Sequence, residues 1–126
     1  MDIEFIRRHC LSLPHTTEQI QWGYDLVFKI AGKMYAVTPT EPAPVWLSFK
    51  CSPDDFAELT ERQGIRPAPY MARAQWVALE AADTLTPEEL RLYLRRSYDL
   101  VVAKLPKKVQ ATLKKPLDKR ANKRRN

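Results

Sequence analysis

The sequence is poor in the residues on which catalysis and metal binding most often depend. Its 126 residues include two cysteines, two histidines and three glycines. Two isolated cysteines exclude a disulfide framework and a paired-cysteine zinc site, and so few glycines leave little for a phosphate-binding loop. The patterns GxGxxG, GxxxxGK(S/T), HExxH and GxSxG are all missing. We therefore expect a protein that is not an enzyme, with no catalytic residues, no metal and no cofactor.

The reactive side chains that are present are not arranged for a reaction. His9 and Cys10 are neighbours in a predicted helix. Adjacent helical residues point about 100° apart, so adjacency does not pair a base with a nucleophile here. Free cysteines are commonly buried, and we expect Cys10 and Cys51 to be reduced core residues.

Long apolar runs are also missing. No stretch approaches the roughly 18 to 20 residues that a membrane span needs. The first residues, MDIEFIRRH, lack the basic and then apolar layout of a secretory signal peptide. We expect a cytoplasmic protein with no membrane contact. Its 44% hydrophobic and 29% charged residues are ordinary for a globular domain.

Positive charge is concentrated towards the end of the sequence. The formal net charge is +6, from 21 basic and 15 acidic residues. From Lys104 onward there are ten basic residues and one acid, so this segment carries +9 and residues 1–103 carry −3. An argument for nucleic-acid binding based on net charge therefore applies to the last segment and not to the whole surface.

Three helices are predicted from apolar spacing and from capping residues. They cover about residues 3–12, the segment from Ser52 to a stop at Gly64, and the segment from Thr86 to Pro106. The third begins with a capping box, in which the side chains of Thr86 and Glu89 each accept a hydrogen bond from the other residue's amide.

Apolar and polar residues alternate with a period of two in several stretches, which predicts half-buried strands. These stretches are residues 26–30, 33–37, 45–50 and 76–79, with 17–22 as an additional edge strand. Only Ala31 and Gly32 separate the first two, which favours a tight antiparallel hairpin. Between Ile65 and Arg73, two prolines predict an irregular segment.

The order of these elements predicts an α+β two-layer sandwich. An antiparallel sheet with one apolar face must have that face covered, and about three amphipathic helices would cover it. The alternation places the following side chains on the opposite face: Lys29, Tyr35, Trp46, Ser48 and Lys50.

Four motifs resemble those of one known family. They are WGYDLVFKIAGKMYAV at 22–37, LSFKC at 47–51, GIRPAPYMARAQWVAL at 64–79 and SYDLVVAKLPKK at 97–108. In this order they are similar to the MmcQ/YjbR family of small bacterial proteins described as DNA-binding. The resemblance implies a frataxin-like fold, whose hairpins have been compared to a double wing that touches DNA. We therefore expect residues 1–108 to form one domain of this kind and residues 109–126 to form a basic C-terminal extension.

The three tryptophans have two interpretations. On an exposed sheet face, Trp46 would offer a surface on which unpaired bases stack. Trp22 and Trp76 lie at strand ends, and we expect them to pack in the core or line a pocket. Such a pocket would combine aromatic and basic residues: Trp22, Lys50, Tyr70 and Trp76.

Basic residues make up the candidate nucleic-acid site. Lys29 and Lys33 flank the two-residue turn, where a hairpin tip can reach phosphates. The family often has Lys-Lys-His before the tryptophan, whereas here Arg73 is the one base that remains. Clustered bases bind polyanions by releasing counterions, largely without regard to sequence. The predicted nucleic-acid-binding residues are Lys29, Lys33, Lys50, Arg73, Lys104, Lys107, Lys108, Lys114, Lys115, Lys119, Arg120, Lys123, Arg124 and Arg125.

Two functions follow as hypotheses. The first is a non-enzymatic protein that binds nucleic acid, with DNA as the expected partner, mostly through phosphate contacts of the C-terminal segment and the hairpin lysines. The alternative is a protein-interaction or small-ligand module of unknown partner, which uses the sheet face or the aromatic and basic pocket. A steep loss of affinity with salt would distinguish the first from the second.

Overall fold

The centre of the fold is a six-stranded antiparallel sheet, seen in a computed structural model that describes residues 2–69 and 71–113. The strands are β1 (Thr16–Gln21), β2 (Asp25–Ile30), β3 (Lys33–Pro39), β4 (Leu47–Lys50), β5 (Ile65–Pro67) and β6 (Trp76–Leu79). They lie in the order β1-β2-β3-β4-β6-β5, and every neighbouring pair is antiparallel.

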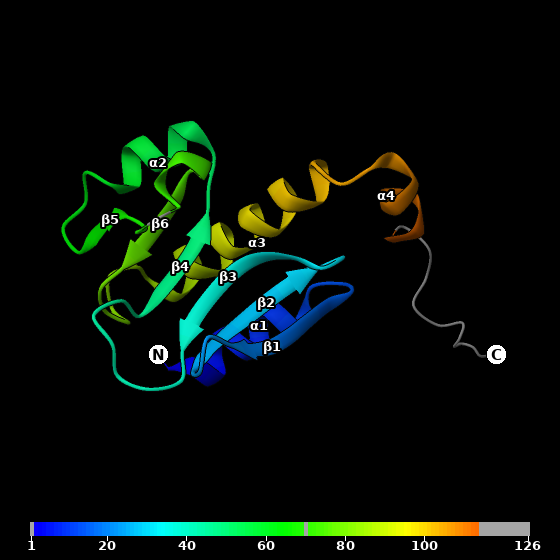
Figure 1. Cartoon of the computed structure of the whole chain (residues 1–126). Coiled ribbons are helices and arrows are strands. Elements are labelled where there is room, and N and C mark those ends of the chain that lie inside the picture. Colours follow the sequence, from blue (N-terminus) through cyan, green and yellow to red (C-terminus); the bar gives the residue numbers. More distant parts are fainter. Residues whose placement is uncertain (1, 70, 114–126) are drawn as a thin grey trace.

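Helices cover one face of this sheet. They are α1 (Ile3–Ser12), α2 (Pro53–Leu59), α3 (Pro87–Ala103) and α4 (Lys107–Leu113). A short 3₁₀ turn, η1 (Ala72–Ala74), precedes β6 and is not part of this layer. Ile6 of α1, Leu59 of α2 and Leu94 of α3 are fully buried in a single core with the strands. Figure 1 shows α1 and α3 behind the sheet, and α4 beyond the tip of the β2–β3 hairpin. The expected α+β two-layer sandwich is confirmed, and we call the opposite side of the sheet the open face.

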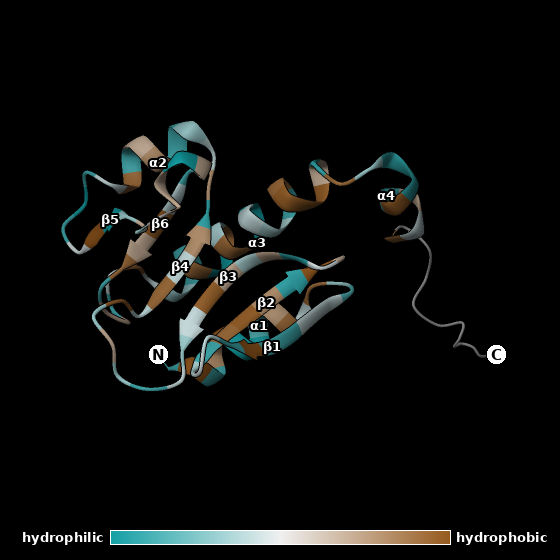
Figure 2. Cartoon of the chain, in the orientation of Figure 1, coloured by the Kyte–Doolittle hydropathy of each residue, from teal (hydrophilic) through white to brown (hydrophobic). Residues whose placement is uncertain are grey.

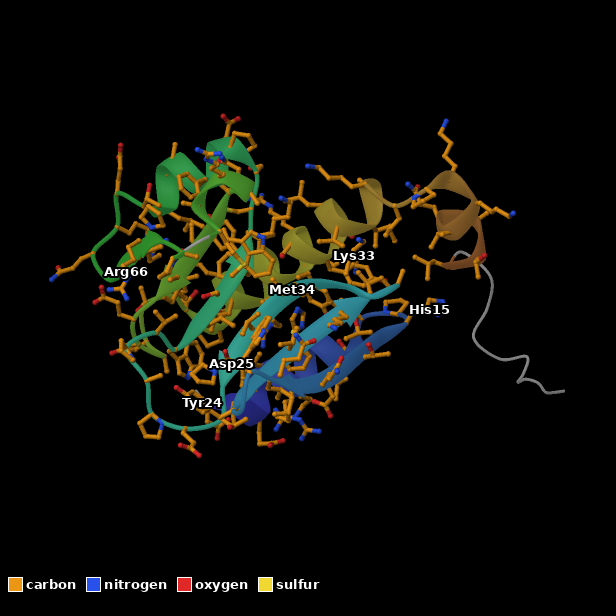
Figure 3. The ribbon with its side chains drawn as sticks, viewed as in Figure 1. His15, Tyr24, Asp25, Lys33, Met34 and Arg66 are labelled. Atoms are coloured by element: carbon orange, nitrogen blue, oxygen red, sulfur yellow. The ribbon has the colours of Figure 1, made fainter. Side chains whose placement is uncertain are left out.

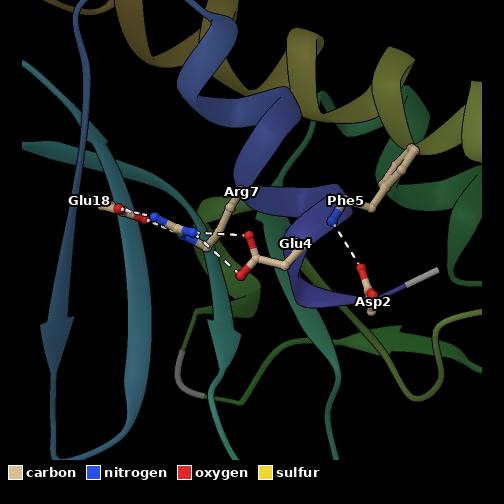
Figure 4. A network of polar contacts seen from close by, with 5 residues as sticks. All are labelled: Asp2, Glu4, Phe5, Arg7 and Glu18. Atoms are coloured by element: carbon tan, nitrogen blue, oxygen red, sulfur yellow. Dashed lines mark hydrogen bonds and ion pairs between the residues drawn. The ribbon is translucent and has the colours of Figure 1, made fainter.

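The residues that start the helices act as the sequence predicts. The Asp2 carboxylate accepts a hydrogen bond from the Phe5 amide at 3.1 Å, and Ser52 Oγ accepts one from the Asp55 amide at 3.1 Å. Figure 4 shows the first of these caps. Both halves of the Thr86–Glu89 capping box are present. Each bond satisfies an amide that has no partner within its helix.

The β2–β3 hairpin has the predicted two-residue turn. Ile30 pairs with Lys33, and both intervening residues have positive φ, +52° at Ala31 and +79° at Gly32. Two such residues make the turn type whose twist matches that of the flanking strands. The turn therefore projects Lys33 at the end of the sheet.

Two expectations about the middle of the chain are wrong. Helix α2 ends at Leu59, well before Gly64, and the positive φ of Gly64 serves the turn into β5 instead. The segment from Ile65 was expected to be irregular, yet Ile65–Pro67 forms the edge strand β5 against β6. Prolines are tolerated there because an edge strand leaves half of its amides without a ladder partner.

A β-bulge reverses the expected placement of Tyr35. Lys29 pairs with Met34 and Phe28 with Ala36, which leaves Tyr35 as an extra residue in β3. Tyr35 was expected on the open face, but it is fully buried on the helix-covered side. Its ring meets Tyr98 of α3 edge-to-face, with ring centroids 5.5 Å apart, and its hydroxyl donates to the Cys10 carbonyl. Met34 occupies the position on the open face that was expected for Tyr35.

Of the three tryptophans, Trp46 differs from expectation. Trp46 precedes β4 and packs against the helix-covered core, so it is not the exposed one. Trp22 is 63% exposed, so it is not a core residue, but it lines a hollow on the open face, which is the other position expected for it. Trp76 is 5% exposed, as expected for packing.

Hydrophobic residues dominate the central strands, as Figure 2 shows for β2 and β4, whereas the edge strand β1 has mixed colours. The open face is partly covered by a small apolar cluster around Ala68, Trp76 and Ala78. None of the helices in the described part of the chain has the length and apolar character required to cross a bilayer.

Candidate functional site

A groove of about 370 Å³ lies at the end of the open face, where the β2–β3 hairpin meets the last residues of α3. We call it the lysine groove. Its basic residues are Lys33, Lys50 and Lys104, and its apolar residues include Met34, Trp76 and Leu105. Figure 3 shows Lys33 and Met34 near the end of α3.

Sheet topology brings together lysines that are far apart in the sequence. Lys33 is the first residue of β3 and Lys50 the last residue of β4, and these strands are antiparallel, so both lie at one end of the sheet. Trp76 pairs with Lys50 in the next strand. Helix α3 ends at Ala103, so Lys104 follows at its negative end, where a cation is favoured.

Lys50 is the most constrained of the three. Its Nζ donates to the Ala74 carbonyl at 2.6 Å, and its backbone amide donates to Ser97 Oγ at 3.1 Å. Partial burial lowers the pKa of Lys50, and the positive charge of Lys104 lowers it further. The two ammonium groups therefore repel each other, and an anion placed between them would relieve that repulsion.

The lysines differ from the arginines in their partners. All six ion pairs of the described residues are formed by arginines. No lysine within residues 2–69 and 71–113 makes one, and no acid is among the described residues that line the groove. Lys29 donates to the Gln19 side-chain oxygen at 3.1 Å, which leaves its charge in place.

Helix α4 adds two more positive charges at the same end of the molecule. Lys107 and Lys108 are exposed in its first turn. Val109 and Leu113 pack against the helix-covered core, and a ring nitrogen of His15 donates to the Leu113 carbonyl at 3.1 Å. These contacts hold α4 beside the hairpin end (Figure 1).

A second hollow, of about 400 Å³, lies on the open face around the β1–β2 turn. We call it the aromatic hollow. Residues that line it include Trp22, Tyr24, Asp25, Arg66, Pro69 and Met71. Figure 3 shows Tyr24, Asp25 and Arg66 away from Lys33, with Met34 between the two groups.

The pocket expected from sequence is divided between these two places. Lys50 and Trp76 line the lysine groove, and Trp22 lines the aromatic hollow. Tyr70 lies outside the described residues. Arg73 is exposed in η1 and does not line the groove. The predicted binding residues of the C-terminal segment that also lie outside the described part are Lys114, Lys115, Lys119, Arg120, Lys123, Arg124 and Arg125.

The thiols belong to the core and not to a site. Cys10 and Cys51 are free and buried. Burial raises the pKa of each thiol to about 12, so both stay protonated near neutral pH. In the described residues no three His, Cys, Asp or Glu side chains are grouped so that they could hold a metal ion.

Fold and site together define a small α+β protein whose antiparallel sheet is covered by helices on one face and carries, at its hairpin end, a lysine groove that no described acid lines. The chain belongs to the YjbR family, because the family model matches residues 11–100. Lys33, Lys50 and Trp76 lie within that match, and Lys104 lies just beyond it.

Solved structures agree with this assignment. The crystal structure of the Deinococcus radiodurans protein DR2400, with a DUF419 domain, is similar with a TM-score of 0.82 and 32% sequence identity. The match covers 91% of this chain and 89% of that one. A protein from Pseudomonas syringae is similar with a TM-score of 0.64 and 20% identity, over 79% of this chain and 98% of that one, which supports the fold only. No curated protein matches the chain.

Proposed function

We propose that the protein binds nucleic acid, with DNA as the expected partner, through phosphates held in the lysine groove. The observation that carries the proposal is the convergence of Lys33, Lys50 and Lys104 in one groove that no described acid lines. Such a cluster attracts a polyanion and releases its counterions. The proposal assigns binding to the groove and no catalytic step.

Other basic residues extend the same surface. Lys29 lies on the open face of β2, and Lys107 and Lys108 are exposed on α4. They would contact further phosphates of a strand that runs across this end of the molecule. The C-terminal bases, which give the segment from Lys104 onward a net charge of +9, would add contacts with little dependence on base sequence.

The test is a salt series with fluorescently labelled single-stranded and duplex DNA, and with RNA of the same sequence. The variant Lys33→Gln with Lys104→Gln removes two groove charges and keeps part of each aliphatic stem. Each lost phosphate contact should flatten the slope of log affinity against log salt by about 0.9 for duplex and about 0.7 for single strands. We expect the double variant to lose about 1.4 to 1.8 in slope.

The matched control is Arg8→Gln with Arg91→Gln, which removes the same charge from exposed positions on α1 and α3. A full-length variant with its seven bases after Leu113 changed to Gln measures the contribution of the C-terminal segment separately. Equal losses in the groove and control variants would show general charge attraction and overturn the groove assignment. Absence of wild-type binding near 0.15 M salt would overturn the proposed function itself.

A further inference from the structure

We infer that the preferred nucleic acid is single-stranded, with phosphates in the lysine groove and an unpaired base stacked on Trp22 in the aromatic hollow. This inference rests on the proposed function and adds the strandedness of the partner. It also assigns a role to the exposed aromatic residues Trp22 and Tyr24, which phosphate binding alone does not involve.

The two hollows adjoin on the same face of the sheet. Ser48 lines the aromatic hollow and Lys50 lines the lysine groove, and both lie on the same side of β4. Residues two apart on one strand are about 7 Å apart. Val37 and Met34 of β3 are three residues apart across the bulge, and both lie on the open face, Val37 in the hollow and Met34 in the groove. One extended strand could therefore occupy both at once.

The charges of the two hollows suit different parts of a nucleotide. In the aromatic hollow, Arg66 is paired with the Glu80 carboxylate at 3.2 Å, and Asp25 adds a negative charge. A phosphate is unfavourable there, but a neutral base is not, and a carboxylate accepts hydrogen bonds from base N–H groups, including the N3–H of thymine. The lysine groove has the opposite character and suits the phosphates.

Packing in the fold does not explain why the Trp22 side chain is exposed to solvent. It is 63% exposed and Tyr24 is 47% exposed, on either side of Gly23. Trp22 also has a φ of +52°, which is unfavourable for a bulky residue. The turn that carries Trp22 and the turn before Lys33 lie at opposite ends of β2, so a bound strand would run along the open face from one to the other. Exposed aromatic rings on the sheet face that also carries a basic groove form the platform on which single-strand binding depends. Duplex bases already stack on each other and offer no free face.

The experiment uses the full chain and an oligo-dT of about 12 nucleotides, the length range of common single-strand sites, with a duplex of equal length for comparison. We expect tighter binding of the single strand. Trp22→Ala should weaken it by about tenfold, because stacking is worth about 1–3 kcal/mol per base. Duplex affinity and the salt slope should not change, since no phosphate contact is lost. Trp22→Phe should retain most of the affinity.

Leu92→Ala is the matched control, since Leu92 is an exposed apolar residue on α3, away from the open face. Quenching of tryptophan emission by oligo-dT gives a second reading, and it should be lost with Trp22. If Trp22→Ala binds oligo-dT like the wild type while Lys33→Gln with Lys104→Gln does not, base stacking is overturned and phosphate binding stands. If the wild type binds neither strand form, both proposals fail.

Discussion

The arginines on the body of the molecule and the lysines at its hairpin end show two uses of the same positive charge. Arg7 lies between Glu4 and Glu18, with contacts of 3.0 Å and 2.7 Å (Figure 4). The ion pair between Arg7 of α1 and Glu18 of β1 joins these two elements. The guanidinium group suits such paired contacts because it offers several donors in a fixed plane. Lys33, Lys50 and Lys104 have no such partner among the residues that the structure describes, so their charge is available to an external anion.

The comparison predicts that changes under the helix-covered face reduce stability, whereas changes in the lysine groove reduce binding. The largest effect on stability is expected for a substitution of Ser97. It is fully buried in α3, donates to the Tyr35 carbonyl at 2.6 Å and accepts from the Lys50 amide at 3.1 Å. Ser97→Ala leaves both backbone groups without this partner, and we expect a loss of about 2–4 kcal/mol in the free energy of unfolding.

Urea unfolding measures this loss. Ser12→Ala is the control, because the exposed Ser12 hydroxyl only donates to the His9 carbonyl at the end of α1, and its loss should cost less than about 0.5 kcal/mol. The groove variant Lys33→Gln with Lys104→Gln should likewise change stability little. A groove variant as unstable as Ser97→Ala would remove the distinction between the two regions.

Glu89 provides an intermediate and pH-dependent effect. Its hydrogen bond from Arg62, and then the one from the Thr86 amide, lower its pKa from 4.5 to about 2. A depressed pKa means that the carboxylate stabilises the fold above about pH 4.5 and loses that effect as the pH falls towards 2. Glu89→Gln should cost about 1 kcal/mol at pH 7, a modest value because the side chain is about one-third exposed.

The expected signature is a stability difference between wild type and Glu89→Gln that shrinks below pH 4.5 and disappears near pH 2. Glu88→Gln, at an exposed position in the same helical turn, should show a much smaller difference at pH 7. A difference that persists unchanged at low pH would mean that the charge of Glu89 is not its source.

The smallest effect concerns Lys50 and leaves stability nearly unchanged. Lys104→Gln should raise the pKa of Lys50, because it removes a nearby positive charge. The value should stay below 10.5, since partial burial, the larger cause, remains. NMR titration of the Lys50 side chain measures this directly. An unchanged pKa would show that the two lysines do not interact across the groove.

Local features of the fold were predictable from sequence because they depend on neighbouring residues. Asp2, Ser52 and Thr86 cap helices through hydroxyl or carboxylate groups three residues from the amides they bind. The two-residue link between alternating segments predicts the β2–β3 hairpin for a similar reason. The same alternation correctly places Lys29 on the open face of β2.

Features that depend on distant segments were not predictable in this way. One extra residue at the bulge sends Tyr35 to the opposite face, and a period-two pattern cannot register that insertion. The lysine groove joins β3, β4, β6 and the end of α3, so no local motif contains it. The positions of the basic residues did contain a signal for the groove. Every lysine of the described residues lies in the β2–β3 hairpin, at the end of a strand or after α3. The arginines, in contrast, are interspersed with acids along the sequence.

The edge strand β5 has a consequence for self-association. It spans only Ile65–Pro67, and Pro67 has no amide hydrogen to offer to an added strand. Arg66 places a charge on the same short edge. Short, charged and proline-containing edges hinder the addition of a strand from another molecule. The β5 edge of the sheet is thus a poor template for edge-to-edge aggregation.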